Sequence, residues 1–535
     1  MSAADRFGLL ATLWRARLIA PMRPDRYLRM GMAMRRAGLT ATVGFAAAAQ
    51  RCPDRPGLID EKGMLTWKQL DDRCDALGVA LQQYRPAVVA VMCRNHRGFV
   101  EALVGANRIG ADVLLLNTSF AGPAMAEVIA REGAGRDIVV IYDDEFTDTV
   151  DRALRDTPGA VRVLGWAETP NGATTVDSLI EAHLGRRPQP ADRKSDVILL
   201  TSGTTGTPKG AKRSAGSGGA GDLKAVLDRT PWRAEEPIVI AAPMFHAWGF
   251  SQLLFAALLA CPIVTRRKFD PEATLELIDR HRATGLAVVP VMFDRIMDLP
   301  DDVRSRYRGS TLRFATASGS RMRPDVVTAF MDQFGDVIYN NYNATEAGMI
   351  ATATPADLRA APDTAGRPAD GTELRILDAE HRELPAGEVG QIFVRSSTLF
   401  DGYTSGTTKD FHDGFMASGD MGYLDAAGRL FVVGRDDEMI VSGGENVYPI
   451  EVEKCLAAHP AVAEAAVLGV DDDQYGQRLA AFVVPEDGAT VDVEDLNQHV
   501  RDNLANYKVP REITVLSELP RGSTGKILRN ELRGR

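Results

Sequence analysis

The chain has 535 residues, of which 45% are hydrophobic and 25% charged, and its formal net charge at neutral pH is −10. A chain of this length exceeds what one hydrophobic core serves, so two or more domains are expected, and the negative charge argues against nucleic-acid binding. The five cysteines form no Cys-x-x-Cys pair, which excludes the common zinc-binding spacing and fits a reducing, cytoplasmic compartment. Because no run of 18 apolar residues is present, no membrane-spanning helix is expected.

Residues 1–36 differ from the rest of the chain in charge, with eight arginines and two acidic residues. Apolar residues recur here at helical spacing beside two of the arginines: Leu9, Leu10, Leu13, Trp14 and Leu18, beside Arg15 and Arg17. A basic amphipathic helix of this kind fits an anionic lipid surface, which predicts peripheral contact with the inner face of the membrane. The alternative is a helix that docks on the body of the protein.

Predicted strands and helices alternate between Leu58 and Leu116. A hairpin is predicted over 58–67, helices over 68–82 and 99–109, and short buried strands over 88–92 and 113–117. Alternation of this kind predicts parallel α/β layering.

The stretch from Leu199 to Gly210 reads Leu-Leu-Thr-Ser-Gly-Thr-Thr-Gly-Thr-Pro-Lys-Gly and follows a short apolar run. Glycines let the main chain approach a polyanion closely, hydroxyls add hydrogen-bond donors, and Lys209 adds a positive charge. The stretch is not a Walker motif, because Gly210 rather than Ser or Thr follows the lysine. It therefore predicts a phosphate-binding loop of another kind, and the alternative is a plain Ser/Thr/Gly linker.

A later segment places aromatic residues after a predicted strand. The strand predicted over 238–242 leads into Pro-Met-Phe-His-Ala-Trp-Gly-Phe at 243–250. A lone histidine among aromatic residues, such as His246, is more often a satisfied core residue than a catalytic one. The residues by themselves leave the role of His246 open.

The strand predicted from Val337 onward ends in polar residues, Asn-Tyr-Asn-Ala-Thr-Glu at 341–346. Polar residues after a strand lie at the carboxyl edge of a parallel sheet, where ligands bind. One carboxylate together with substrate phosphates is the usual way in which a protein holds Mg²⁺, and Glu346 fits that part. The alternative is that Glu346 is an acidic residue in the first turn of a helix.

The last third of the chain contains two further units. Strands with glycine turns over 373–394 predict a small β subdomain, whereas 437–535 has the pattern of a separate α+β domain. That domain has predicted helices at 449–458 and 493–504 and predicted strands at 463–470 and 479–484. Its final segment places Lys526 in a Gly/Ser loop, and a lysine near a C-terminus is usually only solvated.

Five segments, taken in order, resemble the motifs of the adenylate-forming (AMP-binding) superfamily and in particular its fatty acyl-CoA synthetases. They are Thr-Ser-Gly-Thr-Thr-Gly-Thr-Pro-Lys-Gly at 201–210, Tyr-Asn-Ala-Thr-Glu at 342–346, Ser-Gly-Asp at 418–420, Gly-Arg-Asp at 434–436 and Pro-Arg-Gly-Ser-Thr-Gly-Lys at 520–526. The chain departs from the family pattern at Asn343, where glycine is customary, and at Arg321, where a small residue is customary.

The resemblance implies a role for each matched residue. The implied catalytic residues are Lys526, Glu346, Thr345 and His246, with Mg²⁺ held by Glu346. The implied ATP and AMP contacts are Thr201, Ser202, Gly203, Thr204, Thr205, Gly206, Lys209, Ser318, Gly319, Tyr342, Asp420 and Arg435. The implied acyl pocket is His246, Trp248, Phe250, Val289, Val291 and Met349, and the resemblance predicts a strand over 286–291 that lines it. The implied hinge is Asp437, and the implied loop for the thioester step is Gly443, Gly444 and Glu445.

The resemblance also implies an α/β fold with three parts. A basic N-terminal segment, 1–45, precedes a large AMP-binding domain of layered α/β subdomains and a small β subdomain, 46–436. A small mobile α+β domain, 437–535, follows.

The implied activity is ATP-dependent conversion of a carboxylic acid to an acyl-adenylate and then to a thioester of coenzyme A. The apolar pocket residues and the basic N-terminal segment favour a medium- or long-chain fatty acid. One alternative is a fatty acyl-AMP ligase that passes the acyl group to a carrier protein, and another is a luciferase-type oxygenase. A lipid-binding or uptake protein with a decayed site is a further alternative, against which the intact Lys209, Glu346, Asp420, Arg435 and Lys526 argue.

Overall fold

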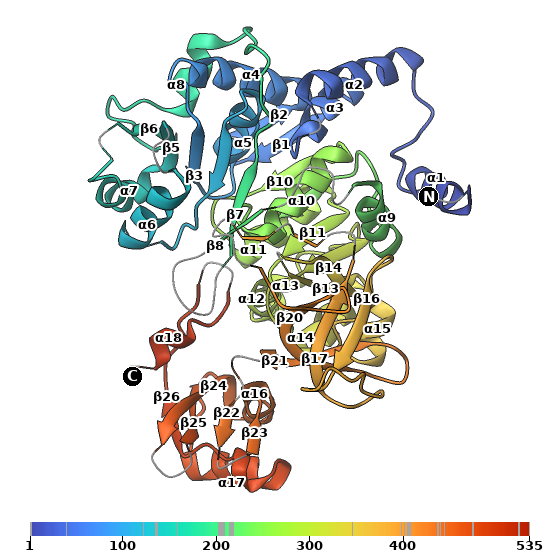
Figure 1. Cartoon of the computed structure of the whole chain (residues 1–535), viewed down its shortest axis with the longest axis vertical. Helices are drawn as coiled ribbons and strands as arrows, with labels where there is room; N and C mark the ends of the chain where they lie inside the picture. Colours follow the sequence, from blue (N-terminus) through green and yellow to red (C-terminus); the bar gives the residue numbers. More distant parts are fainter. Residues whose placement is uncertain are drawn as a thin grey trace. The chain divides into compact units, whose positions relative to one another are not determined.

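A computed structural model describes residues 3–533, apart from residues 39, 121, 134–136, 158, 202–208, 213–218, 345, 397–398, 401, 404–407, 436–437, 439, 443–444, 473–475 and 523–524. The chain divides into two compact units. The first contains Met1–Pro362, Ala369–Gly371 and Ser397–Thr408, and the second contains Asp363–Pro368, Thr372–Ser396 and Lys409–Arg535. Figure 1 labels most of the elements of both units.

One sheet of the first unit has the strand order β18-β8-β7-β4-β3-β5-β6. Neighbours from β7 to β6 are parallel, whereas β8 pairs antiparallel with both β7 and β18. The strands are β3 (Val88–Met92), β4 (Asp112–Leu115), β5 (Ile138–Asp143), β6 (Val161–Trp166), β7 (Val197–Thr201), β8 (Lys209–Lys212) and β18 (Gly402–Tyr403). The predicted parallel α/β layering is confirmed.

Helices cover both faces of this sheet, because alternate residues of its buried strands point to opposite sides. Val89 and Val91 face the core under α4 and α5, and Ala90 and Met92 face the core under α6 and α7. The helices are α4 (Trp67–Gln82), α5 (Arg97–Arg108), α6 (Gly122–Glu132), η1 (Asp144–Phe146), α7 (Thr147–Ala153) and α8 (Val176–His183). Helix α4 begins at a capping box in which Thr66 and Gln69 bond each other's backbone N–H.

A second sheet in this unit contains strands in the order β14-β13-β12-β11-β9-β10-β1-β2. The pairs from β13 to β1 are parallel, and the hairpins β1–β2 and β13–β14 are antiparallel. The strands are β1 (Pro56–Asp60), β2 (Gly63–Thr66), β9 (Ile238–Ile240), β10 (Ile263–Thr265), β11 (Gly285–Val288), β12 (Phe314–Ala317), β13 (Ile338–Ala344) and β14 (Gly348–Ala353). Its helices are α3 (Val43–Arg51), α9 (Gly219–Arg229), α10 (Ala247–Leu258), α11 (Pro271–His281), α12 (Pro290–Met297), α13 (Asp301–Arg304), α14 (Pro324–Phe334) and α15 (Pro355–Ala360).

The strand predicted over 286–291 is too long by three residues. Strand β11 ends at Val288, and Pro290 is the first residue of α12. Proline has no backbone N–H for a sheet ladder, but its fixed φ suits the first position of a helix.

The basic N-terminal segment forms α1 (Ala3–Arg15) and α2 (Pro24–Ala37). Helix α1 docks on α9, where the buried Thr12 hydroxyl donates to Asp228 Oδ1 at 2.6 Å. Its opposite face leaves Phe7, Leu10 and Trp14 exposed, at 76%, 55% and 61% of their surface. Docking on the body and an exposed apolar face therefore occur in the same helix. Among the described helices, none is both long and apolar enough to cross a bilayer.

The second unit contains two sheets. The first has the order β16-β17-β20-β19, with β21 paired to β20, and the second has the order β23-β22-β25-β24, with β26 paired to β25. The strands of these sheets are β16 (Glu373–Leu377), β17 (Gly390–Arg395), β19 (Phe411–His412), β20 (Phe415–Leu424), β21 (Leu430–Arg435), β22 (Ile440–Ser442), β23 (Glu445–Val447), β24 (Val462–Asp472), β25 (Gly476–Pro485) and β26 (Glu512–Val515). The two-residue strand β15 (Arg367–Pro368) also lies in this unit but belongs to neither sheet. The helices are α16 (Pro449–Ala457), α17 (Val493–Asn503), η3 (Asn506–Lys508) and α18 (Arg529–Leu532).

The predicted elements of the C-terminal α+β domain are present within three residues of their expected bounds. The boundary predicted between 436 and 437 lies outside the described residues and stays a prediction. The compact second unit also includes β16, β17, β19, β20 and β21, which the sequence motifs assign to the larger domain.

Candidate functional site

The carboxyl ends of four neighbouring parallel strands meet at one edge of the second sheet. Their register places Ile240 beside Ala287, and Val288 beside Ala317. The segments that leave at this edge carry the predicted site residues of the first unit: His246 and Trp248 after β9, Val289 and Val291 after β11, Ser318 and Gly319 after β12, and Tyr342 and Glu346 at the end of β13 and beyond. This is the edge at which open parallel sheets bind ligands.

A buried amide fixes the strands on which Tyr342 and Ser318 depend. Asn341, 6% exposed, donates from Nδ2 to Thr316 Oγ1 at 2.7 Å and accepts at Oδ1 from the Thr352 hydroxyl at 3.0 Å. These bonds join β12, β13 and β14 under the partly buried Tyr342. Ser318 is buried, and Gly319 has a φ of +106°, a conformation that glycine adopts without strain. The strands that carry Tyr342 and lead into Ser318 are thus joined by buried side-chain hydrogen bonds.

Glu346 lies in the tight turn of the β13–β14 hairpin, so the alternative of a helix first turn is wrong for this residue. Its backbone oxygen accepts from the N–H of Phe400 at 2.7 Å, which fixes the turn. The residue is partly exposed at the ligand edge, and a carboxylate oxygen is a hard donor of the kind that Mg²⁺ prefers. The donor chemistry at this position therefore fits the metal. Thr345 lies outside the described residues.

His246 is the residue before the first turn of α10. The segment that leads into it is fixed by hydrogen bonds to the side chain of Asn95. Asn95, 4% exposed, donates from Nδ2 to the backbone oxygen of Ala242 at 2.9 Å and accepts at Oδ1 from the N–H of Met244 at 2.8 Å. One amide thereby fixes both sides of the turn at Pro243. The sequence analysis missed Asn95, because its partners lie 147 and 149 residues away in the chain.

The residues of the predicted acyl pocket differ in burial. Phe250 and Val289 are 6% and 3% exposed and belong to hydrophobic cores, whereas Val291 and Met349 are partly buried. Trp248 is also partly buried, and its Nε1–H donates to the backbone oxygen of Val288 at 2.8 Å. That bond holds one indole ring in a fixed orientation beside the carboxyl end of β11. The assignment of these residues to an acyl pocket stays a prediction.

The predicted phosphate-binding loop connects two antiparallel strands. Thr201 ends β7 and Lys209 begins β8, and the two residues are backbone partners. Ser202, Gly203, Thr204, Thr205 and Gly206 lie outside the described residues, as do the side chains of Thr201 and Lys209. The structure therefore places the two ends of the loop next to each other.

The second unit brings Asp420 and Arg435 face to face. They are partners in the β20–β21 ladder, and Arg435 Nη1 lies 3.6 Å from Asp420 Oδ1. Within β20, the backbone before Asp420 is fixed by Gly419, whose φ is +86°, and by the Ser418 hydroxyl, which accepts from the N–H of Asp420 at 3.1 Å. A carboxylate and a guanidinium held side by side offer acceptors for a diol and donors for a phosphate.

The remaining predicted residues lie in the C-terminal part of the second unit. Lys526 is exposed and immediately follows the buried Gly525. Glu445 begins β23 and is the backbone partner of Ser442 of β22. Gly443 and Gly444 of the predicted thioester-step loop, and the predicted hinge Asp437, lie outside the described residues.

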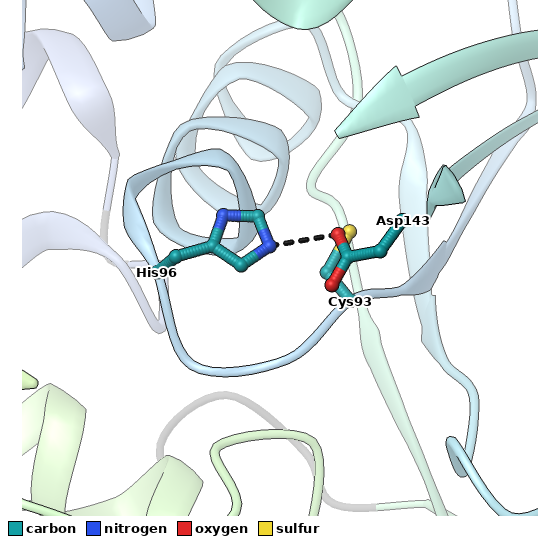
Figure 2. A group of neighbouring side chains, drawn as sticks. All are labelled: Cys93, His96 and Asp143. Atoms are coloured by element: carbon teal, nitrogen blue, oxygen red, sulfur yellow. Dashed lines mark hydrogen bonds and ion pairs between the residues drawn. The ribbon is translucent and has the colours of Figure 1, made fainter. Parts of the chain in front are cut away.

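A buried polar group, Cys93, His96 and Asp143, lies at the start of the segment that carries Asn95 (Figure 2). His96 Nδ1 accepts from the N–H of Gly98 at 3.0 Å, so Nε2 carries the proton and donates to Asp143 Oδ1 at 2.7 Å. Asp143 Oδ2 accepts from the N–H of Arg94 at 3.0 Å. Burial, together with the Asp143 carboxylate, raises the pKa of the Cys93 thiol well above its ordinary value.

The ligand atoms that a metal ion would need are thus already engaged in this group, and the thiol is kept protonated. The packing is also tight, since a Cβ at Gly165 would lie 2.6 Å from the Cys93 sulfur. We therefore assign the group a structural part, which is to hold the segment 93–97 against β5 and so to support Asn95.

Two family profiles match successive parts of the chain. The profile of the AMP-binding enzyme family matches residues 45–404, and the profile of the AMP-binding enzyme C-terminal domain matches residues 451–526. The chain is 32% identical to an indoleacetate–CoA ligase of Aromatoleum aromaticum over 88% of this chain and 92% of that protein. It is 29% identical to the fatty acid–[acyl-carrier-protein] ligase ScoC of Streptomyces coeruleorubidus over 93% and 96% of the two chains.

A solved structure has the same fold. The o-succinylbenzoate-CoA synthetase MenE of Bacillus subtilis, in complex with its acyl-adenylate intermediate, superposes with a TM-score of 0.78 at 25% identity, covering 92% of this chain and 97% of that one.

Proposed function

The chain belongs to the AMP-binding enzyme family, and from this premise we propose that it joins an apolar, aromatic carboxylic acid to coenzyme A. The general activity is that of an AMP-forming acid–thiol ligase, which uses ATP to form an acyl-adenylate and then transfers the acyl group to the thiol. The observation that carries the proposal is the convergence of Tyr342, Ser318, His246 and Trp248 at one carboxyl edge of the sheet.

Two anions must react in the first step. A carboxylic acid with a pKa of about 4–5 is already ionised at neutral pH, so no general base is needed. One carboxylate oxygen attacks the α-phosphorus of ATP, the bond to the β-phosphate oxygen breaks, and pyrophosphate leaves. In the second step the thiol of coenzyme A attacks the acyl carbon, AMP leaves, and one proton is released. The protein's part is positioning and stabilisation of negative charge.

We assign the electrostatic part to Lys526, to Lys209 with the hydroxyls of its loop, and to Arg435. Asp420 would accept hydrogen bonds from the ribose hydroxyls, and Tyr342 would stack on the adenine. Glu346 would hold Mg²⁺, which, when bound, neutralises charge on the phosphates.

The choice of an aromatic acid has two supports. A relative that matches most of this chain is an indoleacetate–CoA ligase. In addition, the Trp248 ring is held by its bond to Val288, and a fixed aromatic wall favours a flat aromatic ligand by offset or edge-to-face packing. A medium- or long-chain fatty acid is the second candidate, supported by the similarity to a fatty acid–[acyl-carrier-protein] ligase and by the apolar residues Val289, Val291 and Met349.

Acid-dependent pyrophosphate release distinguishes these candidates. The purified full chain is given ATP, Mg²⁺ and one acid at a time, with and without coenzyme A: indoleacetate, ferulate, 2-succinylbenzoate, hexanoate, dodecanoate or palmitate. We expect kcat/KM for the best aromatic acid to exceed that for the best fatty acid by roughly tenfold or more, the discrimination that a shaped apolar pocket provides. The reverse order would replace the aromatic acid by the fatty acid.

The acceptor is tested in the same assay. Turnover that depends on coenzyme A and yields acyl-CoA supports the ligase. Slow pyrophosphate release that coenzyme A does not accelerate would instead favour transfer to a carrier protein. If none of the six acids supports pyrophosphate release, both substrate proposals are contradicted, and the non-enzymatic, lipid-binding alternative is favoured.

We also propose that α1 makes peripheral contact with an anionic lipid surface. Its exposed face presents Phe7, Leu10 and Trp14, and the arginines of residues 1–36 supply complementary positive charge. The opposite face of the helix is held on α9 by Thr12, so the apolar residues remain outward.

Vesicle co-sedimentation tests this contact. Phosphatidylcholine vesicles containing phosphatidylglycerol are expected to bind the protein at low salt, and replacing Phe7, Leu10 and Trp14 together by serine is expected to weaken binding by roughly tenfold or more. The triple variant Arg382→Ser, Glu380→Ser and Glu388→Ser, altered at an exposed surface of the second unit, serves as the control. Equal binding by both variants would contradict the contact.

A further inference from the structure

The loop that carries Lys526 is closed by its own backbone. Arg521 and Ile527 form an antiparallel bridge, and the N–H of Gly522 donates to the oxygen of Lys526 at 2.8 Å. The N–H of Leu528 donates to the oxygen of Pro520 at the same distance. These bonds fix the base of the loop on either side of Lys526.

A single guanidinium connects the residue before Lys526 to the sheet of the domain. Arg521 Nη1 donates to the backbone oxygen of Gly525 at 2.6 Å, and Nη2 donates to Glu464 Oε2 at 2.8 Å. Glu464 lies on β24, the strand that pairs with β25 along its whole length. The Arg521 and Glu464 side chains are 24% and 33% exposed, so water screens this ion pair only in part.

The carbonyl that Arg521 holds belongs to the peptide plane that leads into Lys526. Gly525 is buried and has a φ of +77°, which a residue with a Cβ adopts only with strain. Holding its carbonyl therefore sets the direction in which the Lys526 side chain leaves the backbone. A lysine side chain is long and flexible, so the position of its Cα decides which volume its ammonium group can reach.

We propose that Arg521, fixed by Glu464, is a positioning residue for Lys526 and acts in acyl-adenylate formation without contacting a substrate. The inference rests on the proposed function, in which Lys526 serves the adenylation step. It extends that function by naming the residues that set the position of the lysine: one arginine–glutamate pair whose members are 57 residues apart in the chain.

A purely structural role would have a different consequence. The segment is anchored on both sides by other contacts, since Leu519 and Leu532 are buried and Ile527 packs against the same cluster. Loss of Arg521 should therefore leave the C-terminal domain folded and its thioester-step surface intact. Acyl-adenylate formation would then be impaired, whereas transfer of the acyl group to coenzyme A would not.

The test measures both half-reactions in full-length Arg521→Ala, Arg521→Lys and Glu464→Gln. We expect kcat for acyl-adenylate formation to fall by roughly 10- to 100-fold in Arg521→Ala, the scale that follows from misplacing a catalytic group by about an ångström. Acyl-CoA formation from supplied acyl-adenylate should stay within about twofold of wild type, and KM for ATP should change less than kcat. Glu464→Gln should lower kcat for acyl-adenylate formation by a smaller factor, because its amide oxygen still accepts a hydrogen bond. It should likewise leave acyl-CoA formation from supplied acyl-adenylate nearly unchanged.

Arg501→Ala is the matched control, because Arg501 forms an exposed ion pair with Glu494 on α17 of the same domain. It should leave both half-reactions unchanged. Equal loss of both half-reactions in Arg521→Ala, or unchanged adenylation, would overturn the inference. If Arg521→Ala fails to fold, the same criteria apply to Arg521→Lys and Glu464→Gln. The proposed function fails separately, if Lys526→Ala itself retains adenylation.

Discussion

Lys526→Ala is expected to lower acyl-adenylate formation by roughly 10²- to 10³-fold, the effect of removing one charge-stabilising donor from an active site. The reacting carboxylate and the triphosphate are both anions, and negative charge builds on the departing pyrophosphate. A lysine ammonium at the reacting phosphate offsets that charge in the transition state. The second half-reaction attacks the acyl carbon and releases AMP, so we expect it to proceed from supplied acyl-adenylate at nearly the wild-type rate.

The measurement is single-turnover formation of acyl-adenylate from acid and ATP, set beside acyl-CoA formation from synthetic acyl-adenylate. Lys508→Ala is the matched control, because Lys508 pairs with Glu451 elsewhere in the C-terminal domain. An equal loss of rate in both half-reactions of Lys526→Ala would contradict a specific role of Lys526 in adenylation. It would also contradict the role assigned to the segment 520–527.

Asp60→Ala is expected to destabilise the first unit by about 3–5 kcal/mol, the usual cost of removing one partner of a buried ion pair. The Asp60 side chain is fully buried and that of Arg97 is 9% exposed. Asp60 accepts from the Arg97 side chain at 3.0 Å and from its backbone N–H at 2.9 Å. The pair joins β1 of the second sheet to the first turn of α5, so its loss leaves a buried guanidinium without its carboxylate.

Tryptophan fluorescence during urea unfolding measures this effect selectively. All five tryptophans, Trp14, Trp67, Trp166, Trp232 and Trp248, belong to the first unit, so the signal reports that unit alone. Asp72→Ala breaks an exposed pair with Lys68 and should cost about 0.5 kcal/mol or less. The double variant Asp60→Leu, Arg97→Met should recover part of the loss, because it buries no unpaired charge. A cost below about 1 kcal/mol for Asp60→Ala would contradict the assigned role of the pair.

Local patterns were enough to predict most elements of the fold. The strand 88–92 has the predicted bounds because a short apolar run with three valines has the length and composition of a strand buried on both faces. The strand over 286–291 was too long because an apolar run does not reveal that Pro290 begins a helix. The motifs also do not determine the class of acid that the chain uses. The apolar residues favoured a fatty acid, whereas the similarity to an indoleacetate–CoA ligase favours an aromatic acid.

The sequence by itself determined the family, the order of the motifs and the chemistry of the residues in them, because phosphate, metal and ribose contacts need particular groups at particular spacings. Only the tertiary structure decided which residues support these groups. Asn95 bonds the backbone of Ala242 and Met244, 147 and 149 residues away, and Arg521 bonds both Glu464 and the backbone oxygen of Gly525, the residue before Lys526. Such bonds depend on the register of parallel strands and on helix packing, which bring distant residues together and leave no periodic signal in the chain.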